Sequence, residues 1–212
     1  MGRWITKDNR RIHIEDSSGR FGAVAVAVAL GIAIASGGTV ASGLGAGAGS
    51  GSAGGSLVSN SRVRAQDSAN VALRLERRGL RVSSRLSSDE DCAEHSYGRV
   101  QAFFREHPCT ALSRALFEAR DSRRNVVLVA VAWVEMPDAG RARALRALLD
   151  GAGTGNVTEL SRQRGRYRDV RFTGDFYASR RDGSTVVNAQ AQPVGRAAVA
   201  VNLAATVVDA LR

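Results

Sequence analysis

The densest group of chemically versatile residues in this 212-residue chain lies between positions 92 and 109. It contains both cysteines of the chain, Cys92 and Cys109, together with His95, Ser96 and His107. Thiolates and imidazoles are ligands that zinc prefers, and a histidine beside a serine is part of many hydrolytic sites. An oxidised pair of cysteines would instead form a disulfide. Each of these three possibilities requires a different arrangement of the same residues.

A disulfide is the interpretation that the sequence favours for Cys92 and Cys109. The cysteine count is even, and the domain that holds both residues is expected outside the cytoplasm, where thiols become oxidised. One continuous helix from 92 to 109 would separate the sulfur atoms by about 25 Å, which is too far for a bridge. A helix restricted to 97–107 lets the preceding residues fold back, so that the bridge can close. Closing a loop of this length would stabilise the domain by about 3 kcal/mol.

Two alternatives for these residues are a zinc site and a hydrolytic site. The Cys-x2-His and His-x-Cys spacings differ from those of common zinc motifs. His107 is expected at the C-terminal end of a helix, where a cation is favoured. The sequence contains no Gly-x-Ser-x-Gly elbow, and the adjacency of His95 and Ser96 sets no catalytic geometry. We therefore expect no metal and no cofactor, and an envelope enzyme that uses the His95/Ser96 or Cys/His neighbourhood is the alternative to a binding function.

A run of arginines at alternating positions is the second candidate site. If residues 162–168 are extended, their alternate side chains share one face and form a cationic stripe. Such a stripe would bind lipid head groups, an anionic wall polymer or an acidic protein of the envelope. The simpler interpretation is an exposed, soluble loop. The candidate anion-binding residues are Arg162, Arg164, Arg166, Arg168 and Arg171.

The formal net charge of +10 does not by itself indicate a nucleic-acid partner. Of the 30 basic residues, 29 are arginines and one is Lys7, a bias typical of a high-GC genome. Residues 61–212 contain 25 basic and 17 acidic residues, so the positive charge is spread over a domain rather than gathered in a tail. We therefore expect no specific nucleic-acid partner.

No charged residue occurs between Arg20 and Arg62, and this gap sets the expected organisation of the chain. Residues 21–41 form a mostly apolar run that would be about 31 Å long as a helix, enough to cross a bilayer. Basic residues precede the run and none follows it before Arg62, so we expect the N-terminus in the cytoplasm and the domain outside. One alternative is a signal peptide cleaved near Ala35, which would leave the protein secreted. The other is a buried soluble strand, because alanine and valine alternate.

The expected domain organisation follows from this gap and from the glycines after it. Seven glycines from 43 to 55 are typical of a flexible linker, because a phosphate-binding loop would need a preceding strand. Small residues at every fourth position of the apolar run would let two such helices pack closely, through Ala23, Ala27, Gly31 and Ala35. The expected segments are a basic cytoplasmic tail at 1–20, a transmembrane helix at 21–41, a flexible Gly/Ser/Ala linker at 42–66 and an extracytoplasmic domain at 67–212.

The domain at 67–212 shows the sequence patterns of an α+β fold. Helices are expected at 68–78, 97–107, 138–150 and 196–211, and strands at 80–86, 110–120, 126–136, 169–180 and 184–192. The Asp-Gly pair at 182–183 is a strong signal for a tight turn between the last two strands. The economical architecture is one antiparallel sheet of about five strands with helices packed mainly on one face.

Several strings within this domain resemble a family of proteins from high-GC actinobacteria. The strings are Cys92-Ala-Glu-His-Ser-Tyr-Gly98, Phe103-Phe-Arg-Glu-His-Pro-Cys109, Arg171-Phe-Thr-Gly174 and Tyr177-Ala-Ser-Arg-Arg-Asp-Gly183. The resemblance is to single-pass, membrane-anchored proteins of unknown activity, so it implies a location at the cell membrane and no function. We therefore expect a membrane-tethered extracytoplasmic binding or scaffold domain of the cell envelope, whose partners include the lipid bilayer and whose specific ligand the sequence does not identify.

Overall fold

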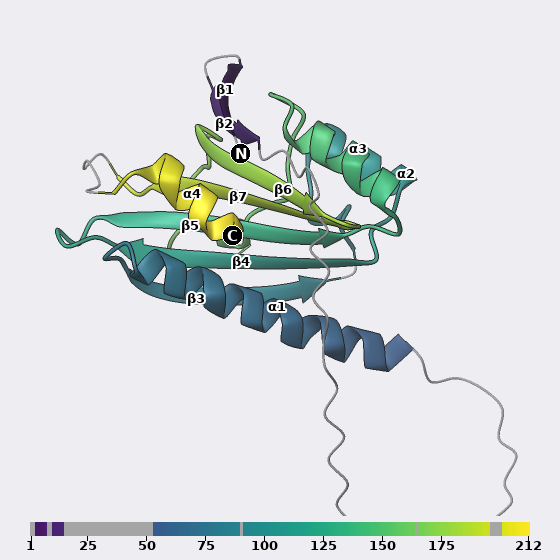
Figure 1. Cartoon of the computed structure of the whole chain (residues 1–212), viewed down its shortest axis with the longest axis horizontal. Coiled ribbons are helices and arrows are strands. Elements are labelled where there is room, and N and C mark those ends of the chain that lie inside the picture. The colour runs from purple at the N-terminus through teal and green to yellow at the C-terminus, as the bar shows by residue number, and fades with distance from the viewer. Residues whose placement is uncertain (1–2, 8–9, 15–52, 90, 164, 196–200) are drawn as a thin grey trace, which may run out of the picture.

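A computed structural model describes the backbone of residues 3–7, 10–14, 53–89, 91–163, 165–195 and 201–212, and the side chains in these ranges from residue 61 onward. The C-terminal part of the chain contains both helices and strands (Figure 1). Their bounds are α1 (Ala53–Glu76), β3 (Arg81–Asp89), α2 (Gly98–Glu106), β4 (Ala111–Arg120), β5 (Val126–Glu135), α3 (Ala139–Leu149), the 3-10 helix η1 (Leu160–Arg162), β6 (Phe176–Asp182), β7 (Thr185–Pro193) and α4 (Leu203–Leu211). Two further strands, β1 (Arg3–Lys7) and β2 (Arg10–Ile14), precede them.

An antiparallel sheet organises the domain, with its strands in the order β6-β7-β5-β4-β3. The prediction of an α+β fold with an antiparallel sheet of about five strands is confirmed. Asp121 holds the turn of the β4–β5 hairpin, because its Oδ1 accepts hydrogen bonds from the backbone N–H groups of Arg123 and Asn125. At the β6 edge of this sheet, β2 pairs in parallel with β6, and β1 pairs antiparallel with β2.

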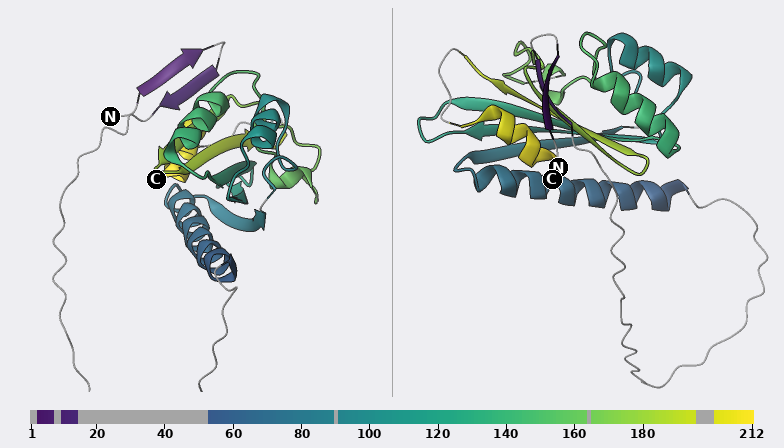
Figure 2. Two further views of the ribbon diagram at one scale, coloured as in Figure 1. Left: turned by 90° about the vertical axis from the view of Figure 1, so that its right-hand side faces the viewer. Right: turned by 45° about the horizontal axis from the view of Figure 1, so that its top comes forward.

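The helices cover both faces of this sheet, so the expectation that they pack mainly on one face is wrong (Figure 2). On one face, Val129 of β5 belongs to a core with Val71 of α1 and Val207 of α4. On the other face, Val134 of β5 belongs to a core with Leu145 of α3 and with residues of α2. The reason lies in β5, where successive side chains are apolar and both faces of the strand must therefore be covered.

The first helix is longer than expected. It was expected to begin near Ser68 and begins at Ala53, so residues 53–66 of the expected linker are helical. Arg64 forms an ion pair with Glu135 at the end of β5, which fixes this part of the helix against the domain. The sequence pattern of the segment did not reveal the helix, because its small and polar residues are also typical of linkers.

The other boundaries agree with the expected ones to within a few residues, except at the start of two C-terminal elements. The strand expected at 169–180 begins at Phe176. Gly174 before it has φ 78°, a left-handed conformation that interrupts an extended chain. The last helix begins only after Asn202, whose side-chain oxygen accepts a hydrogen bond of 3.0 Å from the backbone N–H of Ala205.

The predicted transmembrane helix at 21–41, the small-residue ladder inside it and the first part of the linker lie outside the described residues. Within the part of the chain that the structure describes, no helix is both long enough and apolar enough to span a membrane. The strands β1 and β2 fall in the segment 1–20, where no strand was expected.

Candidate functional site

Cys92 and Cys109 form the predicted disulfide, with their Cα atoms 6.1 Å apart. The helix between them is confined to Gly98–Glu106, so the loop that precedes it folds back along it as the bridge requires. Cys92 is 2% exposed and belongs to the same core cluster as Val100 and Phe104 of α2. The disulfide therefore fixes α2 to the start of β4, and it removes both thiols from any role as zinc ligands.

His95 and Ser96 do not form a base and nucleophile pair. The Nε2 atom of His95 lies 3.2 Å from Oδ1 of Asp89, and its Nδ1 atom lies 3.3 Å from Nε2 of Gln163. The hydroxyl of Ser96 donates a hydrogen bond of 2.7 Å to the carbonyl oxygen of Cys92. Both side chains thus have structural partners, and their neighbourhood does not show the contact that general-base catalysis requires.

His107 follows the last turn of α2, and its ring stands edge-on to that of Phe103 at a centroid distance of 4.9 Å. In the described part of the chain, no group of three or more His, Cys, Asp or Glu residues is placed to hold a metal ion. The Cys/His neighbourhood singled out in the sequence surrounds α2 and contains the disulfide.

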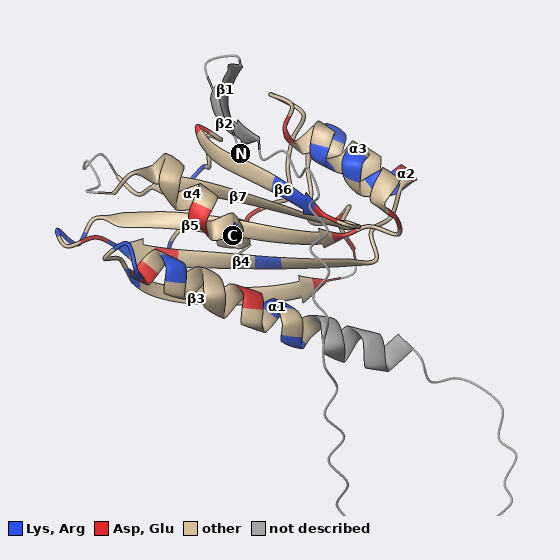
Figure 3. Ribbon diagram, in the orientation of Figure 1, with Lys and Arg blue, Asp and Glu red and all other residues tan. Residues whose placement is uncertain are grey.

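The arginine run does not form a strand. Arg162 ends η1, and turns follow it, so alternation along the sequence does not place these side chains on one face. Arg168 and Arg171 are exposed, and Arg164 lies outside the described residues. Figure 3 shows basic residues on α1, α3 and β4 with acidic residues among them, in keeping with the spread of charge expected from the sequence.

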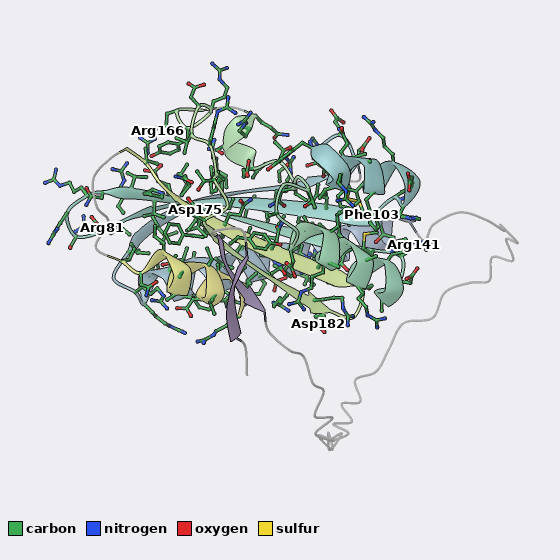
Figure 4. All side chains as sticks on the ribbon, turned by 90° about the horizontal axis from the view of Figure 1, so that it is seen from above. Arg81, Phe103, Arg141, Arg166, Asp175 and Asp182 are labelled. Carbon is green, nitrogen blue, oxygen red and sulfur yellow. A yellow bond between two sulfur atoms is a disulfide. The ribbon has the colours of Figure 1, made fainter. Side chains whose placement is uncertain are left out.

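Arg166 contacts two other side chains of the domain. It forms an ion pair with Glu118 of β4, and its guanidinium carbon lies 4.8 Å from the centre of the Tyr167 ring. These residues and Arg85 border a hollow of about 290 Å³ beside β3. In Figure 4, Arg166 lies at a different end of the domain from Phe103 of α2.

A second pocket brings together residues that the sequence did not single out as a site. It has a volume of about 250 Å³ and is bordered by the start of α2, the loop after α3, and strands β6 and β7. Of the described residues that line it, only Asp150 is charged. The others include three aromatic residues, two amides and five glycines, which are Tyr97, Phe172 and Tyr177, Asn156 and Gln190, and Gly98, Gly151, Gly153, Gly155 and Gly174.

Asp150 borders this pocket from the C-terminal end of α3. Its Oδ1 atom accepts hydrogen bonds from the hydroxyl of Ser179 at 2.6 Å and from that of Tyr177 at 3.1 Å. The Nε atom of Arg146 lies 3.6 Å from Oδ2. Burial raises the pKa of the Asp150 carboxyl above its usual value, although the two hydroxyls and Arg146 act in the opposite direction. Burial and the nearby Asp150 raise the pKa of Tyr177 well above its usual value.

The position of this carboxylate is unfavourable for folding. The C-terminal end of a helix carries a partial negative charge, so an anion there is repelled rather than stabilised. The Asp150 side chain is 20% exposed, so its charged form has lost much of its contact with water. A charge kept in such a place is a mark of functional sites, because folding alone would favour a neutral residue.

The rim of the pocket is fixed by backbone contacts between the loop after α3 and the start of α2. The backbone N–H of Tyr97 donates to the carbonyl of Asn156 at 3.0 Å, and that of Val100 donates to the carbonyl of Thr154 at 3.2 Å. Gly155 has φ 95°, and a Cβ atom there would lie 2.0 Å from the carbonyl oxygen of Tyr97. This close approach requires glycine, so the contact between the two segments depends on Gly155.

The two amides that border the pocket, Asn156 and Gln190, belong to a buried polar layer. The side-chain amide of Asn188 donates to Oδ1 of Asn156 at 2.6 Å, and the amide of Gln190 donates to Oε1 of Glu159 at 3.2 Å. Burial raises the pKa of Glu159 as well. Hydrogen bonds within this layer orient Asn156 and Gln190, the two amides that border the pocket.

Two features of the sequence indicate this site. One is the aspartate that ends α3 directly before the glycine-rich segment 151–155. The other is the alternation of Asn188 and Gln190 with apolar residues in a strand that is covered on both faces. Their convergence with Tyr97, which comes from a distant part of the chain, depends on the fold. No protein-family model matches this chain, and no curated protein or solved structure matches it either.

Proposed function

We propose that the domain at 67–212 is a binding domain of the cell envelope, tethered outside the membrane, and that its ligand occupies the pocket beside Asp150. The observation that carries the binding function is the partly buried carboxylate of Asp150 at the C-terminal end of α3, where it lines the pocket. Its charge is disfavoured by the helix end, while the closely packed glycine rim and the hydrogen-bonded amides around it form a preorganised site.

The proposed location rests on the uncharged segment 21–41 and on the flanking charges. This segment would cross the membrane once, with the N-terminus in the cytoplasm. The Cys92–Cys109 disulfide supports an oxidising location for the domain. Cleavage near Ala35 is the alternative, and it would release the same binding domain from the membrane.

Further partners are proposed for the rest of the chain. The lipid bilayer would surround the segment 21–41, and pairs of such helices would associate through Ala23, Ala27, Gly31 and Ala35. The exposed residues Arg162, Arg168 and Arg171 would contact an anionic polymer or an acidic protein of the envelope. None of these three arginines is among the described residues that line the pocket, and their contacts would hold the domain near its ligand.

Labelling of cysteines on intact cells tests the location. Cells that express the variant Leu73→Cys, which places a cysteine at a 50% exposed position of α1, are treated with an impermeant maleimide, and the extracted protein is measured by intact mass. We expect one added label on a chain that retains residues 1–41. A chain that stays unlabelled until the cells are lysed would contradict the outward orientation, and a mass without residues 1–35 would show cleavage.

Co-sedimentation with cell-wall fragments tests the binding function. The full chain in detergent is mixed with isolated wall material, and the bound fraction is compared with that of Tyr97→Ala. Tyr97 borders the pocket and is 47% exposed, so its truncation should leave the fold intact. We expect at least about a tenfold loss of affinity, equivalent to about 1.4 kcal/mol. The matched control is Leu73→Ala on α1, where a 50% exposed residue is truncated outside the pocket. Equal binding by both variants would contradict the proposal.

A further inference from the structure

We infer that the pocket beside Asp150 takes a neutral, polyhydroxylated ligand, namely one ring of a saccharide. This inference deepens the proposed binding function and rests on it. The argument uses the charge of the pocket, its polar groups, its aromatic residues and its size.

The charge of the lining excludes anions. Asp150 is the one charged group among the described residues that border the pocket, although 30 of the 212 residues in the chain are basic. An anionic ligand would therefore meet a buried carboxylate without a lining cation to compensate it. Phosphorylated or carboxylated ligands would instead suit the exposed arginines elsewhere on the domain.

The partners of Asp150 disfavour cations. Arg146 already lies 3.6 Å from Oδ2, and the hydroxyls of Tyr177 and Ser179 donate to Oδ1. The carboxylate therefore already has a cation and two hydroxyl donors as partners, and an ammonium group would lose its hydration while competing with Arg146 for Oδ2. What Asp150 offers a ligand is the remaining capacity of its oxygens to accept hydrogen bonds from hydroxyl groups.

The remaining polar groups suit a ring that carries several hydroxyls. Asn156 and Gln190 border the pocket with amides that are oriented by Asn188 and Glu159, as described above. An amide both donates and accepts, and a carboxylate accepts twice, which matches neighbouring hydroxyls that act as donor and acceptor in turn. Fixed donors and acceptors of this kind select a ligand by the positions of its polar groups.

Aromatic residues and size complete the match. Tyr97 and Phe172 line the pocket, and their rings can cover the apolar C–H face of a sugar ring, while its hydroxyls meet the amides and Asp150. The volume of about 250 Å³ lies below the range of roughly 300–1,000 Å³ typical of pockets for drug-sized ligands. The pocket therefore fits a single ring, either free or at the end of a glycan.

Titration calorimetry on the full chain in detergent tests the inference. The probes are neutral monosaccharides and their methyl glycosides, with glucuronate and inorganic phosphate as anions and choline as a cation. We expect measurable binding of at least one neutral saccharide, and about a tenfold weaker affinity in Tyr97→Ala and in Phe172→Ala. Leu73→Ala is the matched control and should bind as the wild type does. Thermal melting of each variant shows whether it is folded.

The outcomes separate this inference from the proposed function. Binding of choline or of an anion in the pocket, lost in Tyr97→Ala, would overturn the saccharide class and leave the binding function in place. Binding of a neutral saccharide that both pocket variants retain would place the ligand elsewhere and overturn the inference. If the folded protein binds neither these probes nor wall fragments, the proposed function itself fails.

Discussion

A single carboxylate links folding and binding in this domain. Asp150 ends α3, accepts hydrogen bonds from two side chains of β6, and borders the pocket. The pKa of the Asp150 carboxyl is raised in the folded protein. At pH values between the pKa of the unfolded state and that of the folded state, the unfolded carboxyl is ionised and the folded one is protonated, so folding takes up a proton. The stability contributed by the protonated group is present below its ordinary pKa and is lost as the pH rises through the raised value.

The variant Asp150→Asn should therefore be more stable than the wild type at pH 7, by on the order of 1 kcal/mol. The asparagine keeps an acceptor for Tyr177 and Ser179 and removes the buried charge. The advantage should vanish below the ordinary pKa of 3.8, where both side chains are neutral. Urea unfolding at several pH values measures this difference. A loss of stability at pH 7 would show that the ion pair with Arg146 outweighs burial.

Ligand binding by Asp150→Asn should weaken, because the amide nitrogen that replaces one carboxylate oxygen cannot accept a hydrogen bond. Glu159→Gln is the comparison variant, since burial also raises the pKa of Glu159, which does not border the pocket but accepts a hydrogen bond from Gln190, which does. This variant should also gain stability at pH 7 and lose the gain below about pH 4.5, and its ligand binding should weaken less than that of Asp150→Asn. An equal loss of binding in Glu159→Gln would show that the buried polar layer, rather than Asp150 alone, determines affinity.

Among the elements, the edge of the sheet depends on one buried arginine. Arg114 of β4 is 2% exposed, donates to Oδ2 of Asp89 at the end of β3, and donates to the carbonyl of Thr158 beyond α3, both at 3.0 Å. Burial raises the pKa of Asp89, but Arg114 and His95 outweigh this effect and hold it below its usual value. Arg114 thus joins β3, β4 and the loop that leads to η1.

Arg114→Met should cost about 3 kcal/mol in the free energy of unfolding, because it leaves Asp89 and the Thr158 carbonyl without their cationic partner. Guanidinium unfolding measures the change. Arg81→Met is the matched control on β3, where the arginine is exposed, and should change stability by at most about 0.5 kcal/mol. If both variants unfold at the same denaturant concentration, Arg114 does not tie these elements together.

The unit around α2 depends on its disulfide. Replacing both cysteines, as in Cys92→Ser/Cys109→Ser, should lower the free energy of unfolding by about 3 kcal/mol, since the bridge closes a loop with a sequence separation of 17. Reduction of the wild type should have the same effect and should leave the double variant unchanged. A double variant as stable as the oxidised wild type would show that core packing alone holds α2.

Sequence patterns predicted most of the helices and strands, because the residues that determine each of them lie within it. The apolar run of β5, the Asp-Gly turn after β6, and the helix that ends at Asp150 all carry such patterns. The covering of both sheet faces and the pocket were not predicted, because they depend on how distant elements pack. Tyr97 and Asp150 meet only because backbone hydrogen bonds join the loop after α3 to the start of α2.

At the scale of the whole molecule, the N-terminal strands and the proposed membrane crossing impose different requirements. β2 pairs in parallel with β6, with Arg11 opposite Phe176 and Ile12 opposite Tyr177. This pairing needs residues 10–14 and the domain on the same side of a membrane. The proposed topology places them on opposite sides, and it would leave the edge of β6 beside the pocket without β2. Both arrangements cannot hold for one chain at the same time.

A cross-link between β2 and β6 decides between the two arrangements. Cysteines are introduced at Arg11→Cys and Phe176→Cys, which are directly opposite in the observed register, and oxidation by copper phenanthroline is followed by intact mass. In detergent extracts, where no bilayer separates the two strands, we expect the cross-link to form. In intact membranes we expect none, since the tail would lie in the cytoplasm. The single variant Arg11→Cys controls for cross-links between chains. An intramolecular cross-link in intact membranes would place the tail beside the domain, and segment 21–41 could then not cross the bilayer as a single span.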